Sequence, residues 1–381
     1  DFVAENSIVV GNETRTQLGQ IEMTAKAGSI TTESDAPITA NGRAADDMAV
    51  PPVAEVQGDI TLMAATGITQ GASISSNVLG DVTLTTTTGD IRQNANISAA
   101  TGDVTLTAGQ DVEDDEGVSR FVGGSIVMAE GTSTAISAAG DISYQAGTDI
   151  RSQRVSTNAG DIDFVAENSI VVGNETRTQL GQIELTAKAG SITTESDAPI
   201  TANGRAADGM AMPPVAAVDG DVTLTAATSI TQNADITSDI QGDVTLTANG
   251  GDINQNANIR VIKGDVALTA KSATVDDEVI GGNIVMRDAI GMSAATETTV
   301  KQGDITYTAD ADIRNQVLAT NEGDITLTAG EDIAAGQRIF TGLGQVALEA
   351  TTGSITTDTD APITATGRAA DDYADPVVAA V

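Results

Sequence analysis

The chain has 381 residues, of which 54 are acidic and 18 basic, so its formal net charge is −36. It contains no His, Cys or Trp, which excludes disulfides, Cys/His zinc sites and histidine-based acid–base catalysis. The excess of acidic side chains argues against nucleic acid as a partner, because phosphates are bound by clustered Lys and Arg, and no run of 18 apolar residues predicts a membrane span.

A long repeat begins at the first residue. Residues 1–57 recur at 163–219, and a more diverged copy begins near residue 326. The first two copies differ by five substitutions, which are Met23/Leu185, Asp47/Gly209, Val50/Met212, Glu55/Ala217 and Gln57/Asp219. We therefore predict one continuous solenoid made of repeat unit 1 (1–162), repeat unit 2 (163–325) and a partial unit 3 (326–381). The array starts and stops in mid-pattern, which suggests a piece of a longer array.

A short repeat runs inside the long one. The phrase Gly-Asp-Ile/Val-Thr-Leu-Thr and its variants recur most often every 20–22 residues. They start at Gly58, Gly80, Gly102, Gly140, Gly160, Gly220, Gly242, Gly264, Gly303 and Gly323, and with another residue in the second place at Gly19, Gly124, Gly181, Gly282 and Gly344. Such regular spacing predicts that each period is one structural unit that stacks on the next.

Each phrase alternates apolar and polar residues, as a half-buried strand does. Ile60 and Leu62 would point to one side, and Asp59 and Thr61 to the other. Two further apolar positions follow in each period, separated by turn-forming residues, so a period holds three short strands. We predict an all-β fold, a right-handed parallel β-helix of about 16 rungs of 20–22 residues with one protruding loop per 162-residue unit.

Two structural alternatives remain open at this point. A string of immunoglobulin-like sandwiches would need about 100 residues per domain and more varied strands, so the β-helix is favoured. At the corners, Asn94, Asn233 and Asn256 are explained equally well by amide ladders or by simple turn propensity.

An insertion leaves the short repeat once per long unit. It spans 41–53, recurs at 203–215 and, in altered form, at 366–377. Apolar residues and prolines in a protruding loop suggest a contact, either with its own shaft, which is favoured, or with a neighbouring filament, or, least favoured, with a receptor. The candidate lateral-contact residues are Arg43, Met48, Pro51, Pro52, Arg205, Met210, Pro213, Pro214, Arg368, Tyr373 and Pro376.

Two acidic stretches are candidate Ca²⁺ sites, because hard oxygen ligands suit that ion. They comprise Asp111, Glu113, Asp114, Asp115 and Glu116, and then Asp276, Asp277 and Glu278. Neither stretch has the spacing of a known calcium loop, so a solvated acidic turn is the favoured interpretation. We expect no dedicated cofactor. Ca²⁺ or Mg²⁺ held diffusely along the acidic rod is one explanation of the charge, and solubility alone is the favoured one.

The phrase Ile-Thr-Gln-x-Ala-x-Ile followed by Gly-Asp-Val-Thr-Leu-Thr-Ala resembles the repeats of filamentous-haemagglutinin-type adhesins. It occurs as Ile68-Thr69-Gln70 to Leu84 and as Ile230-Thr231-Gln232 to Leu246. The resemblance covers most of the chain apart from the insertions. It implies a secreted β-helical shaft displayed at a bacterial cell surface, and it carries over no catalytic residue.

The sequence favours an extracellular structural or adhesive fibre that is not an enzyme. Expected partners are other copies of the chain, joined head to tail or laterally, and cell-surface glycans. One alternative is a β-helix surface that binds ice, mineral or glycan through outward threonines such as Thr61, Thr83 and Thr105. A less favoured one is a polysaccharide-acting enzyme, which would need a carboxylate pair in a groove and sugar-stacking aromatic residues.

Overall fold

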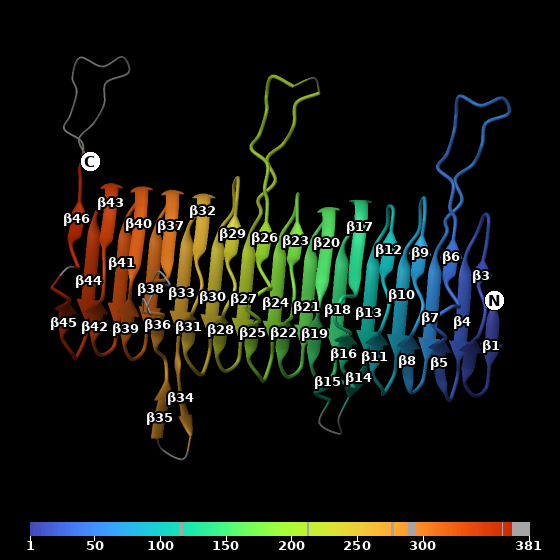
Figure 1. Cartoon of the computed structure of the whole chain (residues 1–381), viewed down its shortest axis with the longest axis horizontal. Coiled ribbons are helices and arrows are strands. Elements are labelled where there is room, and N and C mark those ends of the chain that lie inside the picture. Colours follow the sequence, from blue (N-terminus) through green and yellow to red (C-terminus); the bar gives the residue numbers. More distant parts are fainter. Residues whose placement is uncertain (114–116, 212, 276–277, 289–294, 360, 368–381) are drawn as a thin grey trace. The chain divides into compact units, whose positions relative to one another are not determined.

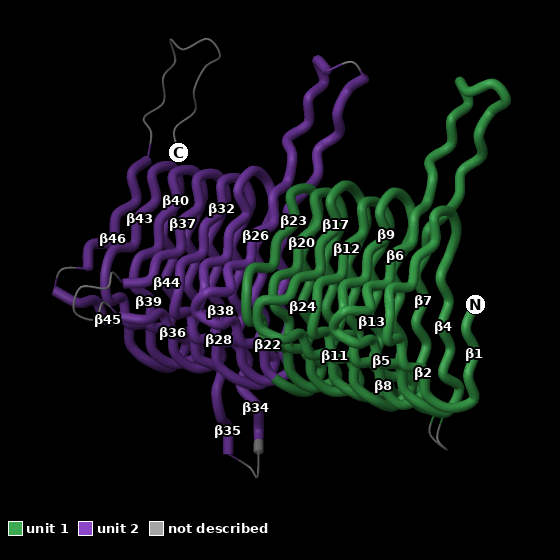
Figure 2. Tube along the Cα trace, turned by 45° about the vertical axis from the view of Figure 1, so that its right-hand side comes forward, with its two compact units in different colours: residues 1–190 green, residues 191–381 purple. Residues whose placement is uncertain are grey.

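The computed structural model describes residues 1–381 except 114–116, 212, 276–277, 289–294, 360 and 368–381. The described residues form strands and turns and contain no helix, so none of their segments is a helix suited to crossing a membrane. They divide into two compact units, 1–190 and 191–381 (Figure 2). The boundary between these compact units differs from the boundaries of the predicted repeat units, which were placed by the sequence repeat.

Unit 1 is a coil with three parallel sheets, each of which supplies one face (Figure 1). The first face consists of β1 (Phe2–Ala4), β4 (Ile21–Ala25), β7 (Ile60–Ala64), β10 (Val82–Thr86), β13 (Val104–Ala108), β18 (Ile142–Ala146), β21 (Ile162–Ala166) and β24 (Ile183–Ala187). The second face consists of β2 (Ile8–Val10), β5 (Ser29–Thr32), β8 (Gly67–Gln70), β11 (Ile91–Gln93), β16 (Ile126–Met128), β19 (Ile150–Ser152) and β22 (Ile170–Val172). The third face consists of β3 (Thr14–Arg15), β6 (Ile38–Ala40), β9 (Ile74–Ser76), β12 (Ile97–Ala99), β17 (Ser133–Ala139), β20 (Arg154–Ala159) and β23 (Thr176–Thr178).

Unit 2 has the same three faces. Its first face consists of β27 (Val222–Ala226), β30 (Val244–Ala248), β33 (Val266–Ala270), β38 (Ile305–Ala309), β41 (Ile325–Ala329) and β44 (Val346–Ala350). The second consists of β25 (Ile192–Thr194), β28 (Ile230–Gln232), β31 (Ile253–Gln255), β36 (Ile284–Met286), β39 (Ile313–Asn315), β42 (Ile333–Ala335) and β45 (Ile355–Thr357). The third consists of β26 (Ile200–Ala202), β29 (Ile236–Ser238), β32 (Ile259–Lys263), β37 (Glu297–Gln302), β40 (Val317–Glu322), β43 (Ile339–Leu343) and β46 (Ile363–Ala365).

The right-handed parallel β-helix predicted from the sequence is confirmed. Within each unit, each first-face strand pairs in parallel with the equivalent strand of the next coil, so Val82 lies between Ile60 and Val104 as expected. Their side chains are fully buried, while the outward Thr83 keeps partial contact with water. The interior is therefore a set of mainly aliphatic columns, in which the rings of Tyr144, Phe164 and Tyr307 are also fully buried.

The first face has eight strands in unit 1 and six in unit 2 among the described residues, against about sixteen rungs expected. The difference comes from Gly124 and Gly282, whose sequences resemble the start of a rung. Each of these two glycines lies directly before a second-face strand and not before a first-face strand. In both places a β-hairpin is inserted at the corner between the first and second faces, and the glycine follows it. The hairpins are β14 (Gln110–Glu113) with β15 (Ser119–Val122), and β34 (Ser272–Val275) with β35 (Glu278–Gly281).

The Gly-Asp phrase has a structural cause at the corner before each first-face strand. Gly160 has φ +144°, and a Cβ there would lie 2.1 Å from the carbonyl oxygen of Gly140 in the coil before it, so only glycine fits. The aspartate after each such glycine accepts a hydrogen bond from the backbone of the next coil. For example, Asp141, which follows Gly140, accepts through Oδ1 from Asp161 N at 2.8 Å. In unit 1 the same bond joins Asp59 to Asp81, Asp81 to Asp103, and Asp103 to Asp141.

The interior also holds polar side chains that the sequence analysis did not place there. In unit 1 the buried Tyr144 hydroxyl donates to Thr134 Oγ1 at 2.6 Å, and Thr134 in turn bonds to Gln93. Unit 2 repeats the cluster with Tyr307, Thr298 and Gln255. Burial raises the pKa of both tyrosine hydroxyls above the usual value, so they remain neutral donors.

Candidate functional site

Among the described residues, two segments project far from the coil, and we call them arm 1 (residues 41–57) and arm 2 (residues 203–219). Each arm leaves the coil at the corner between the third and first faces, after β6 in unit 1 and after β26 in unit 2 (Figure 1). The two glycines at the base of arm 1 are in close contact, because a Cβ on Gly58 would lie 2.4 Å from Gly42 N. The arm therefore leaves the coil through a narrow neck without interrupting the stack.

The base of arm 1 is bonded to the turns on both sides of it. Asn41 Nδ2 donates to Thr16 O at 3.0 Å, and Gly58 N donates to Leu79 O at 2.6 Å. Two exposed apolar side chains, Leu18 and Val78, belong to these turns. They consequently border the arm's base, and the sequence analysis did not identify them.

The arms are held in shape by their own hydrogen bonds. In arm 1, Arg43 and Val56 exchange two backbone hydrogen bonds, as do Asp46 and Val53. The Arg43 guanidinium donates to Ala54 O at 3.0 and 3.2 Å across the gap between these pairs. Arm 2 repeats the same bonds with Arg205, Val218, Asp208, Val215 and Ala216.

A capped turn closes each arm at its end. Asp46 Oδ1 accepts hydrogen bonds from the backbone N–H groups of Met48 and Ala49, at 3.0 and 3.1 Å. In arm 2, Asp208 does the same for Met210 and Ala211. This is an Asx turn, which fixes the backbone locally. Arg43 and Met48 could be predicted as contact residues from the sequence, whereas the role of Asp46 in shaping the turn between them could not.

The tips of the arms are apolar and lie in water. Met48 is 92% exposed, Val50 99% and Met210 95%. The favoured expectation that the insertion packs on its own shaft is therefore wrong for these side chains, because the arm's own bonds hold the tip away from the coil. Pro51, Pro52, Pro213 and Pro214 are also exposed, whereas Arg368, Tyr373 and Pro376 lie outside the described residues. Lateral contact stays a prediction.

The candidate Ca²⁺ residues fall on the two β-hairpins. Asp111 and Glu113 lie on β14, and Glu278 lies on β35, all exposed. Asp114, Asp115, Glu116, Asp276 and Asp277 lie outside the described residues. Within the part of the chain that the structure describes, no three acidic side chains come close enough together to hold a metal ion. Calcium binding here stays a prediction.

An acidic recess lies on the first face of unit 1 and was not predicted. Its volume is about 320 Å³, and Asp141, Asp161, Asp163 and Glu184 line it. Asp163 of β21 lies directly opposite Glu184 of β24. Partial burial, and secondarily the negative charge of Glu184, raise the pKa of the Asp163 carboxyl.

We expect Asp163→Asn to stabilise the protein at pH 7. The raised folded-state pKa means that the folded protein binds the proton more tightly than the unfolded chain. The contribution of Asp163 to the free energy of unfolding therefore falls as pH rises through that pKa. Removing one of two facing carboxylates should raise the free energy of unfolding by about 0.2–1 kcal/mol at pH 7. The gain should be smaller at a pH below the ordinary pKa of Asp, where the carboxyl is protonated in both states. Urea unfolding at both pH values measures this.

The control for this variant is Glu130→Gln, which removes an exposed charge from the same unit. It should change the unfolding midpoint by less than the Asp163 variant at pH 7. A destabilised Asp163→Asn protein at pH 7 would show that the carboxylate makes a favourable contact.

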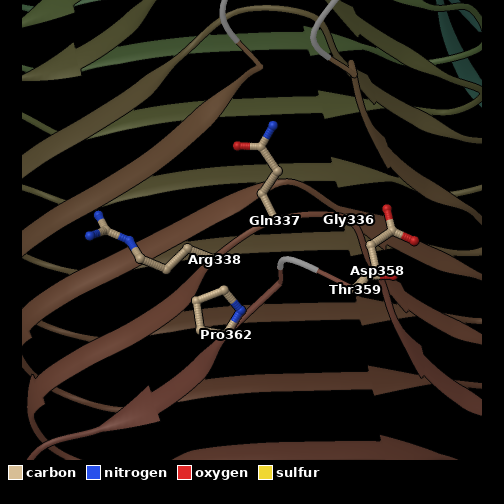
Figure 3. A pocket seen from close by; sticks show the side chains of 6 residues that line it. All are labelled: Gly336, Gln337, Arg338, Asp358, Thr359 and Pro362. Atoms are coloured by element: carbon tan, nitrogen blue, oxygen red, sulfur yellow. The ribbon is translucent and has the colours of Figure 1, made fainter.

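A larger recess of about 670 Å³ lies in unit 2, at the corner between the second and third faces (Figure 3). Gln337 and Arg338 come from one coil, and Asp358, Thr359 and Pro362 from the next. The Arg338 guanidinium lies 5.4 Å from the ring centre of Phe340. Figure 3 shows that the side chains of Arg338 and Asp358 point away from each other, so they do not converge on one ligand.

The first face of unit 2 carries two rows of outward threonines. The register aligns Thr225, Thr247, Thr269, Thr308 and Thr328 in one row, and Thr223, Thr245, Ala267, Thr306 and Thr326 in the other. Threonine is also a favoured residue on any strand surface. A role of this face in binding ice, mineral or glycan therefore stays a prediction.

Comparisons with protein families, curated protein sequences and solved structures found no match for this chain. The fold and the surface elements are thus the basis for a functional proposal.

Proposed function

We propose that this chain is a shaft segment of an extracellular bacterial fibre with a structural or adhesive role and no catalysis. The observation that carries the proposal is the sameness of the coils. In each unit, successive first-face strands pair in register with the same buried aliphatic positions, and the described residues of each unit include one arm and one β-hairpin. Repetition of this kind provides length and a periodic surface, which a fibre needs.

Three further features support an extracellular shaft. The repeats resemble those of filamentous-haemagglutinin-type adhesins in the segment from Ile68 to Leu84 and in that from Ile230 to Leu246. The absence of Cys makes the chain independent of the redox conditions outside the cell. The net charge of −36 keeps neighbouring rods apart at low salt.

Electron microscopy of the purified chain tests the proposal. A 162-residue block contains six first-face strands, from β1 to β18 in unit 1, so coils about 4.8 Å apart should give an axial repeat of about 29 Å. We expect thin rods, and we expect antibodies against the arms to label intact cells of the source bacterium. Globular particles, or labelling only after the cells are broken, would refute the fibre.

A further inference from the structure

We propose that the arms are self-association elements, and that each arm docks antiparallel against an arm of a second copy of this chain. This inference refines the proposed function, because it names the partner and the surface through which shafts would join. Its starting point is the distribution of exposed apolar side chains around arm 1.

Large apolar side chains that are exposed lie at both ends of arm 1, whereas the exposed side chains of its stem are small or acidic. The tip carries Met48 and Val50, and the turns that border the base carry Leu18, 51% exposed, and Val78, 44% exposed. Between the two backbone pairs, the stem carries the exposed Ala44 and Ala45 on one strand and Ala54 and Glu55 on the other, and the paired Val53 and Val56 are half-buried. A stem of about five extended residues separates the two apolar ends by about 16 Å.

This pattern is self-complementary. When two arms lie side by side in opposite directions, the tip of each one reaches the base of the other. Met48 and Val50 of one copy would then cover Leu18 and Val78 of the second copy, and the reverse contact forms at the same time. This is the isologous arrangement of a two-fold interface, in which one patch serves both partners. A partner without large apolar side chains at both ends of a stretch of the same length would cover only one end.

The arm is also ready to bind without folding first. The two backbone pairs, the Arg43 bonds to Ala54 O and the Asp46 turn cap define its shape in the isolated copy. The pairs at 43/56 and 46/53 leave the stem residues between them without backbone partners across the arm. Such an edge can pair with another extended strand, and a preformed edge loses little conformational entropy on binding.

Arm 2 repeats the pattern in unit 2. Met210 is the exposed tip, and Ile240, 46% exposed, lies in the turn bonded to the arm's base through Gly220 N and Gln241 O. Gly209 in its tip turn and Ala217 in its stem replace the acidic Asp47 and Glu55 of arm 1. The frame residues Arg205 and Asp208 and the apolar tip are retained, so the substitutions change the stem charge and leave the docking pattern in place.

Electrostatics make this contact dependent on salt. Each copy has a net charge of −36, and arm 1 itself carries Asp46, Asp47 and Glu55 against one Arg43. Two arms therefore repel each other at low ionic strength, and association should appear as the Debye length falls from about 30 Å at 0.01 M to about 8 Å at 0.15 M salt.

Disulfide trapping tests the docking directly, because the chain has no cysteine of its own. Two single-cysteine proteins, Met48→Cys and Val78→Cys, are mixed at 0.15 M salt and oxidised. The pairing of tip and base predicts a Met48–Val78 heterodimer in clear excess over the product of a mixture of Met48→Cys and Val279→Cys. Val279 is a suitable control, because it is 68% exposed but lies on the hairpin strand β35.

Sedimentation gives a second measurement that needs no cross-link. The variant Met48→Asp/Val50→Asp/Met210→Asp should weaken self-association about tenfold or more, while Val279→Asp should change it little. A chain that stays monomeric at all salt concentrations, or a Met48 cysteine that couples equally to residues 78 and 279, would overturn the docking. If the micrographs then showed single rods without bundling, the docking would be refuted and the proposed role as a fibre would still hold.

Discussion

Replacing Gly160 by alanine is expected to destabilise unit 1 by about 3 kcal/mol or more. The residue has φ +144°, which costs an L-residue conformational energy, and the added Cβ would lie 2.1 Å from Gly140 O. That oxygen belongs to the backbone of the preceding coil and cannot move aside without breaking the stack. The midpoint of urea unfolding, together with the slope of the transition, measures the loss.

Gly131 provides a matched control in the same unit. It also has a left-handed φ, +77°, but an added Cβ would meet nothing within 4 Å. Gly131→Ala should therefore cost only the backbone term, about 1 kcal/mol. Equal losses in the two variants would mean that the close approach of successive coils at Gly160 does not exist in solution.

Leu246→Ala should cost unit 2 about 3–5 kcal/mol. The side chain is fully buried, and it is stacked in register between Leu224 and Leu268. Coils on both sides are tied by backbone hydrogen bonds, so they cannot collapse into the space that the three missing carbons leave. The deletion therefore creates a cavity in addition to removing buried apolar area, and urea unfolding at pH 7 measures the sum.

The neighbouring residue Thr245 gives the control for the column. It faces outward on the same strand, β30, beside Thr223 and Ala267. Thr245→Ala should change the free energy of unfolding by less than about 1 kcal/mol. A loss at Thr245 as large as that at Leu246 would contradict the assignment of inner and outer positions.

The coil could be predicted from the sequence because the signal repeats. One alternating phrase such as Ile60-Thr61-Leu62 is weak, but the same phrase every 20–22 residues allows the register between Ile60, Val82 and Val104 to be derived by alignment alone. The hairpins escaped detection because Gly124 and Gly282 imitate the start of a coil. Of the corner asparagines, Asn233 and Asn256 are shown to bond side chain to side chain, at 2.9 Å.

The candidate site was predicted less completely, for a physical reason. The composition of the insertion indicated a contact at Met48, but whether the loop lies on the coil depends on bonds such as those of Arg43 to Ala54 O, which composition does not reveal. Leu18 and Val78 are separated by 60 residues in the chain and come to the arm's base only through stacking. The facing pair of Asp163 and Glu184 likewise becomes visible only once the register is known.

Each arm has a narrow neck, where Gly42 meets Gly58 in arm 1 and Gly204 meets Gly220 in arm 2. This neck affects how the number of repeats can change in the gene. Residues 58–219 make up one block of 162 residues, and their deletion would join Gln57 to Gly220, a glycine in the same local setting as Gly58. Because a block holds a whole number of coils, β27 would then follow arm 1 where β7 does now, with its aliphatic positions in phase. Unequal crossing-over between such near-identical gene segments can therefore shorten or lengthen the protein, and the strands on the two sides of the junction stay in register.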